Sequence, residues 1–203
     1  MLNVFLDTET TGLNPGQICE LSLIAEDDFN FKFAKNYFFR VSAMEEGAEA
    51  VHGLSQTALI GLSKGLEFKD YKDELYSILS NSVIIAHNES FDEKFISSEF
   101  WRLGVSFKPS GRLDTMSYFK DVLKIPAKSK RYGPYKNPKL SEVMDYFHVD
   151  NVKVNELCNR LFGSIKVDYH DSRFDTTAMY VAVNLQREVA HGIEGDWHKN
   201  FCL

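Results

Sequence analysis

The sequence predicts an α/β fold, and three stretches of the chain support this prediction. Residues 2–41 contain apolar or alternating runs joined by short polar segments, which is typical of an antiparallel meander of strands. Residues 83–86 form a short, fully apolar strand followed by a helical pattern, as in a parallel crossover unit. An apolar stripe at helical spacing near the end of the chain predicts one long helix.

The meander is expected to contain three strands. Residues 2–7 are the first, and residues 18–25 alternate apolar and polar side chains as the second. The third region has two apolar runs, 29–33 and 37–41, after a polar turn. Short connections between these runs favour antiparallel pairing.

The rest of the chain alternates helical patterns with short apolar strands and loops. The elements expected are, in order, a loop with a short helix (42–66), a helix (67–80), a strand (83–86), a helix carrying Phe91 to Leu103, and helices at 116–123, 140–147 and 155–162. The last long helix carries the stripe from Phe174 to Val189, and Gly192 and Gly195 are expected to end it.

Residues 124–139 differ from the rest of the chain. They hold six basic residues, three prolines and no acid, and they predict a loop because Pro and Gly interrupt regular structure. Two interpretations remain open for this loop. It is either a solvated linker or a mobile basic flap over a phosphate backbone, where Lys and Arg supply affinity without sequence choice.

Length and composition limit the class of protein. A chain of 203 residues predicts a single domain, 1–203, that can bury a substantial core. The net charge of −6 argues against electrostatic binding of nucleic acid by the whole molecule, unless several acids bind metal. Cys19, Cys158 and Cys202 are widely separated, which indicates neither a zinc site nor a disulfide framework.

Targeting signals are not evident in the sequence. The N-terminus has no basic region, and no apolar run approaches the roughly 18 residues of a membrane-spanning helix. We therefore expect a soluble, cytoplasmic protein in a reducing compartment, with no membrane partner.

Two acids directly follow the first predicted strand. Asp7 and Glu9 are two residues apart, so in a strand their side chains point to the same face. Like charges so close repel each other, whereas hard divalent cations prefer oxygen ligands. The pair therefore indicates half of a metal site, and the alternative is a polar turn after a core strand.

Two further groups of polar residues lie beside apolar elements. Asp92 follows the strand 83–86, and His170 and Asp175 flank the start of the last helix. Each has an ordinary structural explanation, and Asp171 is expected to cap that helix. Together, four acids and one histidine match the needs of two divalent metals and a water nucleophile.

These residues also carry a resemblance to a known family. Asp7-Thr8-Glu9 with the following Thr-Gly-Leu, His87-Asn88 with Asp92, and His170 with Asp175 resemble the three motifs of the DEDDh (DnaQ-like, proofreading-type) 3′→5′ exonucleases. Weaker matches are Ala50 to Leu54, Leu113 to Thr115 and Lys139 to Val143. The resemblance spans residues 4 to about 185, in the family's order.

The resemblance implies a fold and a metal site. The fold is RNase H-like, with a mixed five-stranded sheet, its first three strands antiparallel, and helices on both faces. Two ions, Mg²⁺ or Mn²⁺, would be held by Asp7, Glu9, Asp92 and Asp175, with Asp7 bridging both ions and Asp92 able to act through water. His170 would be the general base that deprotonates the attacking water.

The resemblance also implies a substrate. Thr10 and Leu13 resemble the family's contacts to the 3′-nucleotide, and His52 and Asn88 are weaker candidates for the same pocket. The expected activity is 3′→5′ hydrolysis of single-stranded nucleic acid to nucleoside 5′-monophosphates. We favour DNA, because the first motif looks more like the polymerase-proofreading branch.

Three alternatives remain beside this function. One is an exoribonuclease that trims RNA ends. Another is a proofreading subunit that acts mainly with a DNA polymerase, to which the tail Asp196 to Leu203, with Trp197 and Phe201, could dock. The third, an RNase H-type endonuclease, is disfavoured because the paired motifs match the exonucleases.

Two segments depart from the family pattern. Residues 148–168 intervene before the third motif, and the basic loop 124–139 is unusually rich in Pro and Lys. We treat both as insertions in the single domain. Because both lie next to the expected site, substrate preference does not transfer from any one subfamily.

Overall fold

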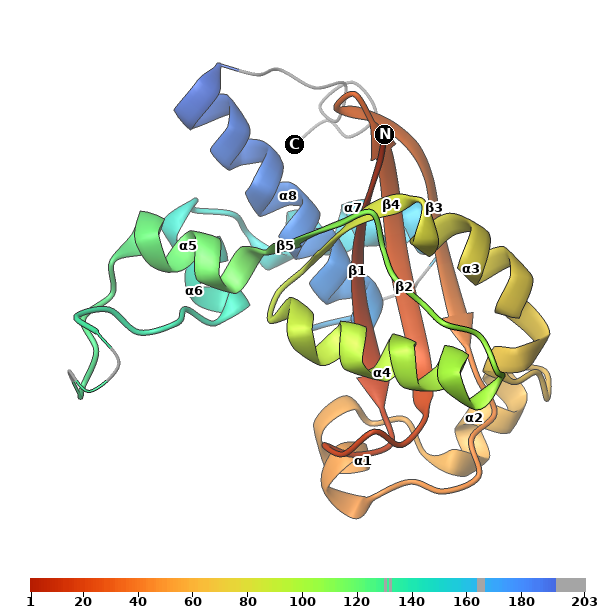
Figure 1. Cartoon of the computed structure of the whole chain (residues 1–203). Helices are drawn as coiled ribbons and strands as arrows, with labels where there is room; N and C mark the ends of the chain where they lie inside the picture. The colour runs from red at the N-terminus through yellow and green to blue at the C-terminus, as the bar shows by residue number, and fades with distance from the viewer. Residues whose placement is uncertain (130, 132, 164–166, 193–203) are drawn as a thin grey trace.

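A mixed five-stranded sheet forms the centre of the molecule (Figure 1). The computed structural model describes residues 1–129, 131, 133–163 and 167–192. The strand order is β3-β2-β1-β4-β5, with β1 antiparallel to β2, β2 antiparallel to β3, and β4 parallel to both β1 and β5. The strands are β1 (Leu2–Thr10), β2 (Ile18–Asp27), β3 (Asn30–Phe38), β4 (Ser82–Ala86) and β5 (Gly111–Asp114). The expected meander and parallel crossover are both confirmed.

Helices cover both faces of the sheet (Figure 1). One face carries α3 (Lys72–Ser80) and α4 (Glu89–Arg102). The opposite face carries α5 (Thr115–Leu123), α6 (Leu140–Tyr146), α7 (Asn151–Phe162) and α8 (Ser172–His191). Two short helices, α1 (Glu46–His52) and α2 (Gln56–Leu62), lie near the end of the sheet where β1 stops.

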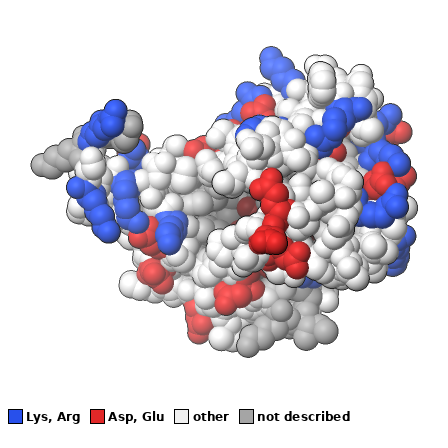
Figure 2. Space-filling model, turned by 90° about the horizontal axis from the view of Figure 1, so that it is seen from below, with Lys and Arg blue, Asp and Glu red and all other residues white. Residues whose placement is uncertain are grey.

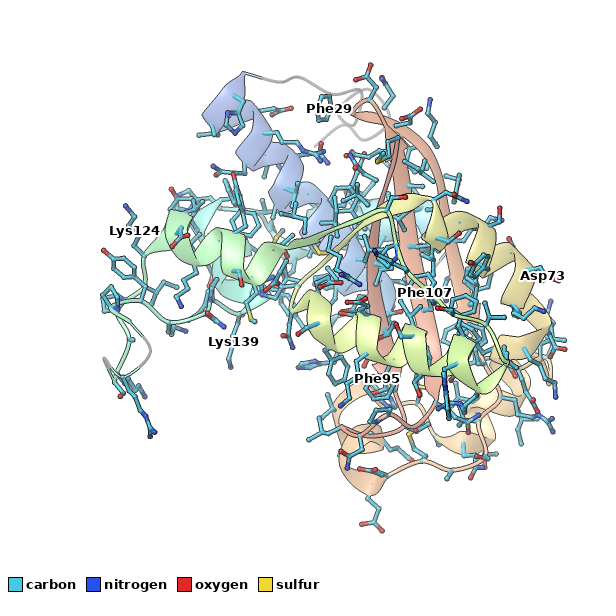
Figure 3. All side chains as sticks on the ribbon, viewed as in Figure 1. Phe29, Asp73, Phe95, Phe107, Lys124 and Lys139 are labelled. Carbon is cyan, nitrogen blue, oxygen red and sulfur yellow. The ribbon has the colours of Figure 1, made fainter. Side chains whose placement is uncertain are left out.

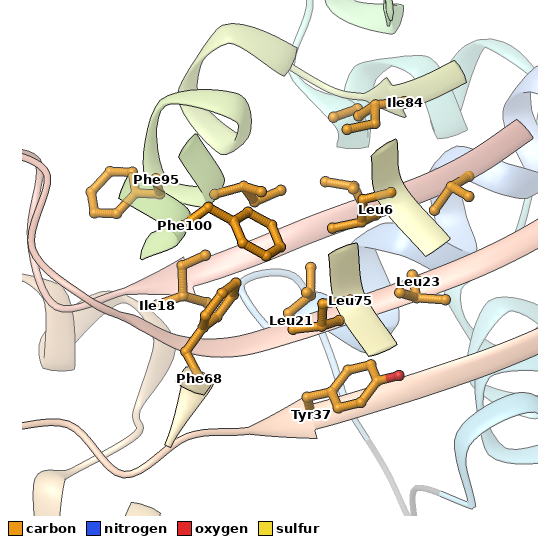
Figure 4. Packing of buried hydrophobic residues seen from close by; sticks show 14 of the residues in the cluster. Leu6, Ile18, Leu21, Leu23, Tyr37, Phe68, Leu75, Ile84, Phe95 and Phe100 are labelled. Atoms are coloured by element: carbon orange, nitrogen blue, oxygen red, sulfur yellow. The ribbon is translucent and has the colours of Figure 1, made fainter. Parts of the chain in front are cut away.

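Strand β1 is buried on both faces, and its side chains alternate between two cores. Leu6 packs with Phe95 and Phe100 of α4 in the core shown in Figure 4. Phe5 points the other way and meets Tyr180 of α8 edge to face, with ring centroids 5.0 Å apart. By the same alternation, Asp7 and Glu9 share the face of α8, and Thr8 shares the face of α4.

The first strand is longer than the sequence predicted. It was expected to end at residue 7, but the ladder with β2 continues through Glu9 opposite Glu20 and ends with a bulge between Glu9 and Thr10. Pairing with β2 holds these polar residues in extended conformation. Both acids therefore lie inside the strand, within its last four residues.

Four other expectations need correction. The segment 42–66 contains two helices instead of one, and the helix expected at 67–80 begins with a 3₁₀ turn, η1 (Phe68–Tyr71), before α3. The helix expected at 155–162 begins earlier, at Asn151, because the Asp150 side chain caps it by accepting from the Val152 N–H. Strand β5, which was not recognised as a strand, pairs with β4 at the edge of the sheet.

Helix α8 ends where the sequence predicted, since Gly192 adopts the left-handed conformation with φ 62° directly after it. Gly195 and the tail with Trp197 and Phe201 lie outside the described residues. Over the described part of the chain, no helix is both long and apolar enough to cross a membrane.

Candidate active site

Three carboxylates converge where β1 meets the first turn of α8. Each of Asp7, Glu9 and Asp175 offers an oxygen, and these three oxygens lie within 4.8 Å of one another. The two acids of β1 reach this point because they share the face that α8 covers. Like charges this close are unfavourable unless protons or a cation neutralise them.

The start of α8 is fixed by a network around Asp171. Its side chain accepts from the Arg173 N–H at 3.1 Å, which confirms the predicted N-cap. The Arg173 guanidinium returns to the same carboxylate with two hydrogen bonds of 2.9 and 2.6 Å. Asp175 then lies in the first turn of the helix, with its N–H donating to the Asp171 carbonyl.

The cap supplies a stability prediction with a matched control. Asp171→Ala should lower the free energy of unfolding by about 2 kcal/mol, since the helix loses its cap and the Arg173 guanidinium loses its two hydrogen bonds to Asp171. Asp150→Ala removes only the cap of α7 and should cost about 1 kcal/mol. Urea unfolding of both variants checks the difference, and equal costs would show that the guanidinium contacts contribute nothing.

Asp92 approaches the cluster from the other face of the sheet. It is 2% exposed in the first turn of α4, and its Oδ1 accepts a hydrogen bond of 2.8 Å from the Thr8 hydroxyl. Its charge is the largest electrostatic contribution to the raised pKa of Asp7, after burial. Asp92 therefore lies near Asp7, although it is not one of the three acids whose oxygens converge.

Burial raises the pKa of every acid in the site. It is the first cause in each case, and the neighbouring carboxylates add to it for Asp7, Glu9 and Asp175. The pKa of Asp7 lies well above its usual value, that of Glu9 rises to about 9, and those of Asp92 and Asp175 rise to about 7. Without a cation the folded protein therefore favours the protonated acids.

The acids fit a divalent cation. Asp175 Oδ2 accepts from the His170 N–H at 3.1 Å, whereas Oδ1 is buried with no hydrogen-bond partner among the described residues. A buried carboxylate oxygen without a partner is costly unless it binds something. Carboxylate oxygens are the ligands that Mg²⁺ and Mn²⁺ prefer.

Glu20 is a further buried acid beside Glu9, and no local sequence pattern indicates it. It lies opposite Glu9 across the β1–β2 pair, fully buried, with Arg173 Nε 3.4 Å from its Oε1. Burial first and the Asp171 charge second raise its pKa to about 8, while Arg173 opposes them. Only the cross-strand register could have revealed it.

One cavity beside the acids contains His170. We call it the His170 cavity; its volume is about 440 Å³, and it is lined by Asp7, His87, Lys139, Leu140, Ser141, Tyr169, His170 and Asp175. His170 is exposed and has a left-handed backbone with φ 69°, an uncommon conformation outside glycine. Its bond to Asp175 Oδ2 holds the backbone in this conformation. His170 therefore shares a cavity with two of the acids.

His87 closes the same cavity and joins distant segments. Its Nε2 donates to the Pro138 carbonyl at 3.0 Å, and its Nδ1 faces the Thr115 hydroxyl at 3.1 Å. Burial lowers the pKa of the ring, so it is neutral near pH 7. His87 thus ties the end of β4 to Thr115 at the start of α5 and to Pro138 in the segment before α6.

A second cavity lies on the other side of Glu9. We call it the Leu13 cavity; its volume is about 320 Å³, and it is lined by Thr8, Glu9, Thr10, Gly12, Leu13, Glu45, Gly47, Ala48, Val51, His52 and Phe91. Leu13 is 79% exposed and Val51 is also exposed, so apolar surface faces solvent here. Of the four predicted nucleotide contacts, Thr10, Leu13 and His52 come together in this cavity.

His52 and Asn88 have clear structural roles. His52 Nδ1 accepts from the Leu54 N–H at 3.0 Å, so the proton is on Nε2, which donates to the Thr10 carbonyl at 3.2 Å. Asn88 begins α4 in the left-handed conformation, and its N–H donates to Asp114. Asn88 is not among the described residues that line either cavity.

The fold is similar to that of solved exonucleases. Escherichia coli exonuclease I in complex with a dA16 oligonucleotide matches 94% of this chain and 41% of its own, with a TM-score of 0.70 and 15% identity. Exonuclease X in complex with 5′ overhanging duplex DNA matches 95% of both chains, with a TM-score of 0.59 and 15% identity. These likenesses confirm the RNase H-like exonuclease fold.

The sequence itself identifies the family. The model of the exonuclease family RNase_T matches residues 4–180, and the chain belongs to that family. DNA polymerase III subunit epsilon of Buchnera aphidicola subsp. Acyrthosiphon pisum is 33% identical over 132 residues, covering 60% of this chain and 52% of the relative. The subunit epsilon of Haemophilus influenzae is 26% identical over 160 residues, covering 74% and 58%.

These relatives confirm the predicted resemblance to DEDDh-type exonucleases. A third relative, the 3′-5′ exonuclease DinG of Staphylococcus haemolyticus, is 28% identical over 117 residues, covering 57% of this chain and 13% of the relative. The chain thus spans about half the length of the epsilon subunits that it matches, and a small part of DinG.

Proposed function

We propose that this protein is a metal-dependent 3′→5′ exonuclease that hydrolyses single-stranded nucleic acid to nucleoside 5′-monophosphates. The observation that carries the proposal is the convergence of the Asp7, Glu9 and Asp175 oxygens within 4.8 Å, beside a cavity that contains His170. Membership of the exonuclease family supports it.

Asp7, Glu9 and Asp175 would hold the cation, and Asp92 is close enough to Asp7 to contribute. Mg²⁺ or Mn²⁺, as one or two ions, suits these hard oxygen ligands. When bound, the cation supplies stabilisation of the negative charge on the phosphate and on the attacking and leaving oxygens. The unpartnered Oδ1 of Asp175 supports this assignment.

His170 would accept the proton of the attacking water. It lines the same cavity as Asp7 and Asp175, and its exposure leaves the ring accessible to solvent. Histidine is the side chain that most often serves as a general base. The bond from its N–H to Asp175 fixes the backbone beside the acids.

The Leu13 cavity would hold the 3′-terminal nucleoside. Its apolar lining, including Leu13, Val51 and Phe91, offers surfaces for a base, and Glu9 links it directly to the acids. Aromatic and apolar surfaces bind bases by stacking, with little dependence on sequence. Thr10 and His52 border the same cavity, and His52 holds the end of β1 through the Thr10 carbonyl.

Leu13→Ser supplies a test of this pocket. It should raise KM for an oligonucleotide by roughly 10-fold, because the base no longer covers a leucine side chain, whose full burial is worth about 1.5–3 kcal/mol. The melting temperature should barely change, because Leu13 is 79% exposed. The equally exposed Val189→Ser, on α8 and outside both cavities, serves as the control, and an unchanged KM for Leu13→Ser would exclude Leu13 from the pocket.

The activity is tested with a 5′-labelled single-stranded oligonucleotide and Mg²⁺ or Mn²⁺. A 3′→5′ exonuclease should produce a ladder that shortens one nucleotide at a time and release mononucleotides. Chelation of the metal should stop the reaction. Cleavage of a circular single strand would instead indicate an endonuclease, and full activity of Asp175→Ala would exclude the proposed site.

We favour DNA over RNA as the substrate. The epsilon relatives are named as subunits of a DNA polymerase, which supports DNA. Recognition of RNA depends on contacts to the 2′-hydroxyl. Digestion of DNA and RNA oligonucleotides of the same sequence tests the preference, and faster digestion of RNA would support the exoribonuclease alternative.

The names of the epsilon relatives also favour a second candidate, a proofreading subunit that acts with a polymerase. Such a subunit should bind its polymerase during purification. A monodisperse chain that is fully active alone would argue against this role.

A further inference from the structure

Residues 124–129, 131 and 133–139 form an arm that projects from the main body (Figure 1). It leaves the end of α5 and returns to the start of α6. Its two sides pair through hydrogen bonds of 2.9 Å from the Ala127 N–H to the Pro134 carbonyl and from the Lys136 N–H to the Ile125 carbonyl. An isolated bridge between Pro126 and Tyr135 lies between them. The expected loop is thus a paired arm.

The base of the arm is attached to the candidate active site. His87 donates to the Pro138 carbonyl, and Lys136 Nζ lies 2.6 Å from Glu142 Oε2 of α6. Lys139, which directly follows Pro138, lines the His170 cavity. In Figure 3, Lys139 lies at the base of the arm and Lys124 lies farther from the main body. A chain leaving the His170 cavity past Lys139 would therefore meet the arm.

Basic side chains surround a hollow on the arm. Its volume is about 440 Å³, and it is lined by Lys120, Ala127, Lys128, Ser129, Gly133, Tyr135, Lys136 and Asn137. Among the described residues, Lys120, Lys124 and Lys128 take part in no ion pair. Figure 2 shows Lys and Arg gathered on the projecting arm, with a largely uncharged, hollowed surface between it and the acidic residues of the main body.

The basic side chains on the arm contrast with the negative charge of the whole molecule. With a net charge of −6, the protein as a whole repels a polyanion, so attraction has to come from a local basic surface. A solvated linker needs no hollow lined by three lysines and a tyrosine. Lysines bind phosphates as point charges, and tyrosine offers a face on which a base can stack.

We propose that the arm, together with Lys120, is a second nucleic-acid contact that binds phosphates of the substrate strand on the 5′ side of the scissile bond. This inference rests on the proposed function. If the terminal nucleoside occupies the Leu13 cavity and the scissile phosphate lies at the acids, the remaining strand leaves through the His170 cavity. Lys139 borders that exit, and the arm continues from it.

The test is binding of a fluorescent oligo(dT) of about 20 nucleotides, measured by anisotropy in EDTA so that no hydrolysis occurs. The triple variant Lys120→Gln/Lys124→Gln/Lys128→Gln should weaken binding roughly 10-fold at low salt. The slope of log K against log salt should become shallower by about 2, as expected for the loss of three phosphate contacts on a single strand. The double variant Lys124→Gln/Lys128→Gln, at exposed positions only, should give a smaller loss in the same direction.

A matched control separates the arm from net charge. Lys32→Gln/Lys64→Gln/Lys108→Gln makes the same charge change at exposed lysines that line neither the arm nor the two cavities. This control should bind within about 2-fold of the unmodified protein, and a dinucleotide probe should bind all variants alike. Equal weakening by both triple variants, no weakening by the arm variant, or an equal effect on the dinucleotide would overturn the inference.

The proposed function is checked separately with the p-nitrophenyl ester of thymidine 5′-monophosphate, which is too small to reach the arm. The arm variant should hydrolyse it with unchanged kcat/KM. Absence of hydrolysis by the unmodified protein would count against the proposed function alone. If the arm variant binds oligo(dT) as tightly as the control variant does, the result would count against the proposed role of the arm alone.

Discussion

Asp7→Asn should make the metal-free protein more stable at about pH 8 and remove most of its response to Mn²⁺. Burial and four neighbouring acids raise the pKa of Asp7, so the neutral amide relieves a penalty that the carboxylate carries. In the unmodified protein, Mn²⁺ at about 100 times its Kd should contribute about 2.7 kcal/mol, or roughly 5–10 °C in melting temperature. Calorimetry or dye-based melting with EDTA and with Mn²⁺ measures both effects. The nuclease activity should fall at least 10³-fold, because charge stabilisation at the reacting phosphate is lost.

The control for this prediction is Asp121→Asn, which removes an exposed carboxylate of α5 that lines neither cavity. Its melting temperatures with and without Mn²⁺ should match those of the unmodified protein. An equal Mn²⁺ response in Asp7→Asn would show that the cation binds elsewhere. Reduced metal-free stability of Asp7→Asn would contradict the electrostatic account of the cluster.

Glu20→Gln should stabilise the metal-free protein in alkaline solution and leave it unchanged in acid. The pKa of Glu20 is raised from 4.5 to about 8, mainly by burial. A raised carboxyl pKa contributes stability that is fully present below the unfolded pKa and is lost as the pH rises through the folded pKa. The free energies of unfolding of the variant and of the unmodified protein should therefore be equal near pH 4.5. Their difference should grow up to about pH 8.5, by about 1.4 kcal/mol for each unit by which folding raises the pKa of Glu20. Urea unfolding in EDTA across this range measures the divergence.

Glu74→Gln gives a control of opposite sign. Hydrogen bonding from Lys35 lowers the pKa of Glu74, so its stabilising contribution is present above the unfolded pKa and lost in acid. Glu74→Gln should lower stability slightly at about pH 8, since this ion pair is well exposed. A pH-independent effect of Glu20→Gln would show that Glu20 does not titrate over this range in the folded protein.

Local patterns predicted the acids of the site, because each lies within a few residues of a recognisable element boundary. Asp7 and Glu9 share a face by strand alternation, and Asp175 lies one turn inside a helix that Asp171 caps. The meander, the parallel crossover and the long final helix follow from apolar periodicity. Apolar periodicity depends only on residues close together in the sequence, so it can be recognised without knowledge of the tertiary structure.

Contacts that depend on register could not be predicted. The Thr8 hydroxyl meets Asp92 from 84 positions away, and Glu20 lies beside Glu9 only because β1 continues past Asp7. Phe91 joins the Leu13 cavity through the orientation of α4, which no local pattern encodes. Strand β5 was missed because a strand of four residues has too few positions to show alternation.

Strand β1 limits how the two cavities of this protein could change. Asp7 faces one cavity and Glu9 the other, so both cavities share a single wall. In that wall β1 is held by its pairing with β2, which runs through Thr10, whereas its pairing with β4 covers only Leu2 to Phe5. Remodelling β1 would disturb the acids and both cavities at once. Changes in specificity are therefore confined to the outer walls, which are α1 and its loop on one side and the base of the arm on the other.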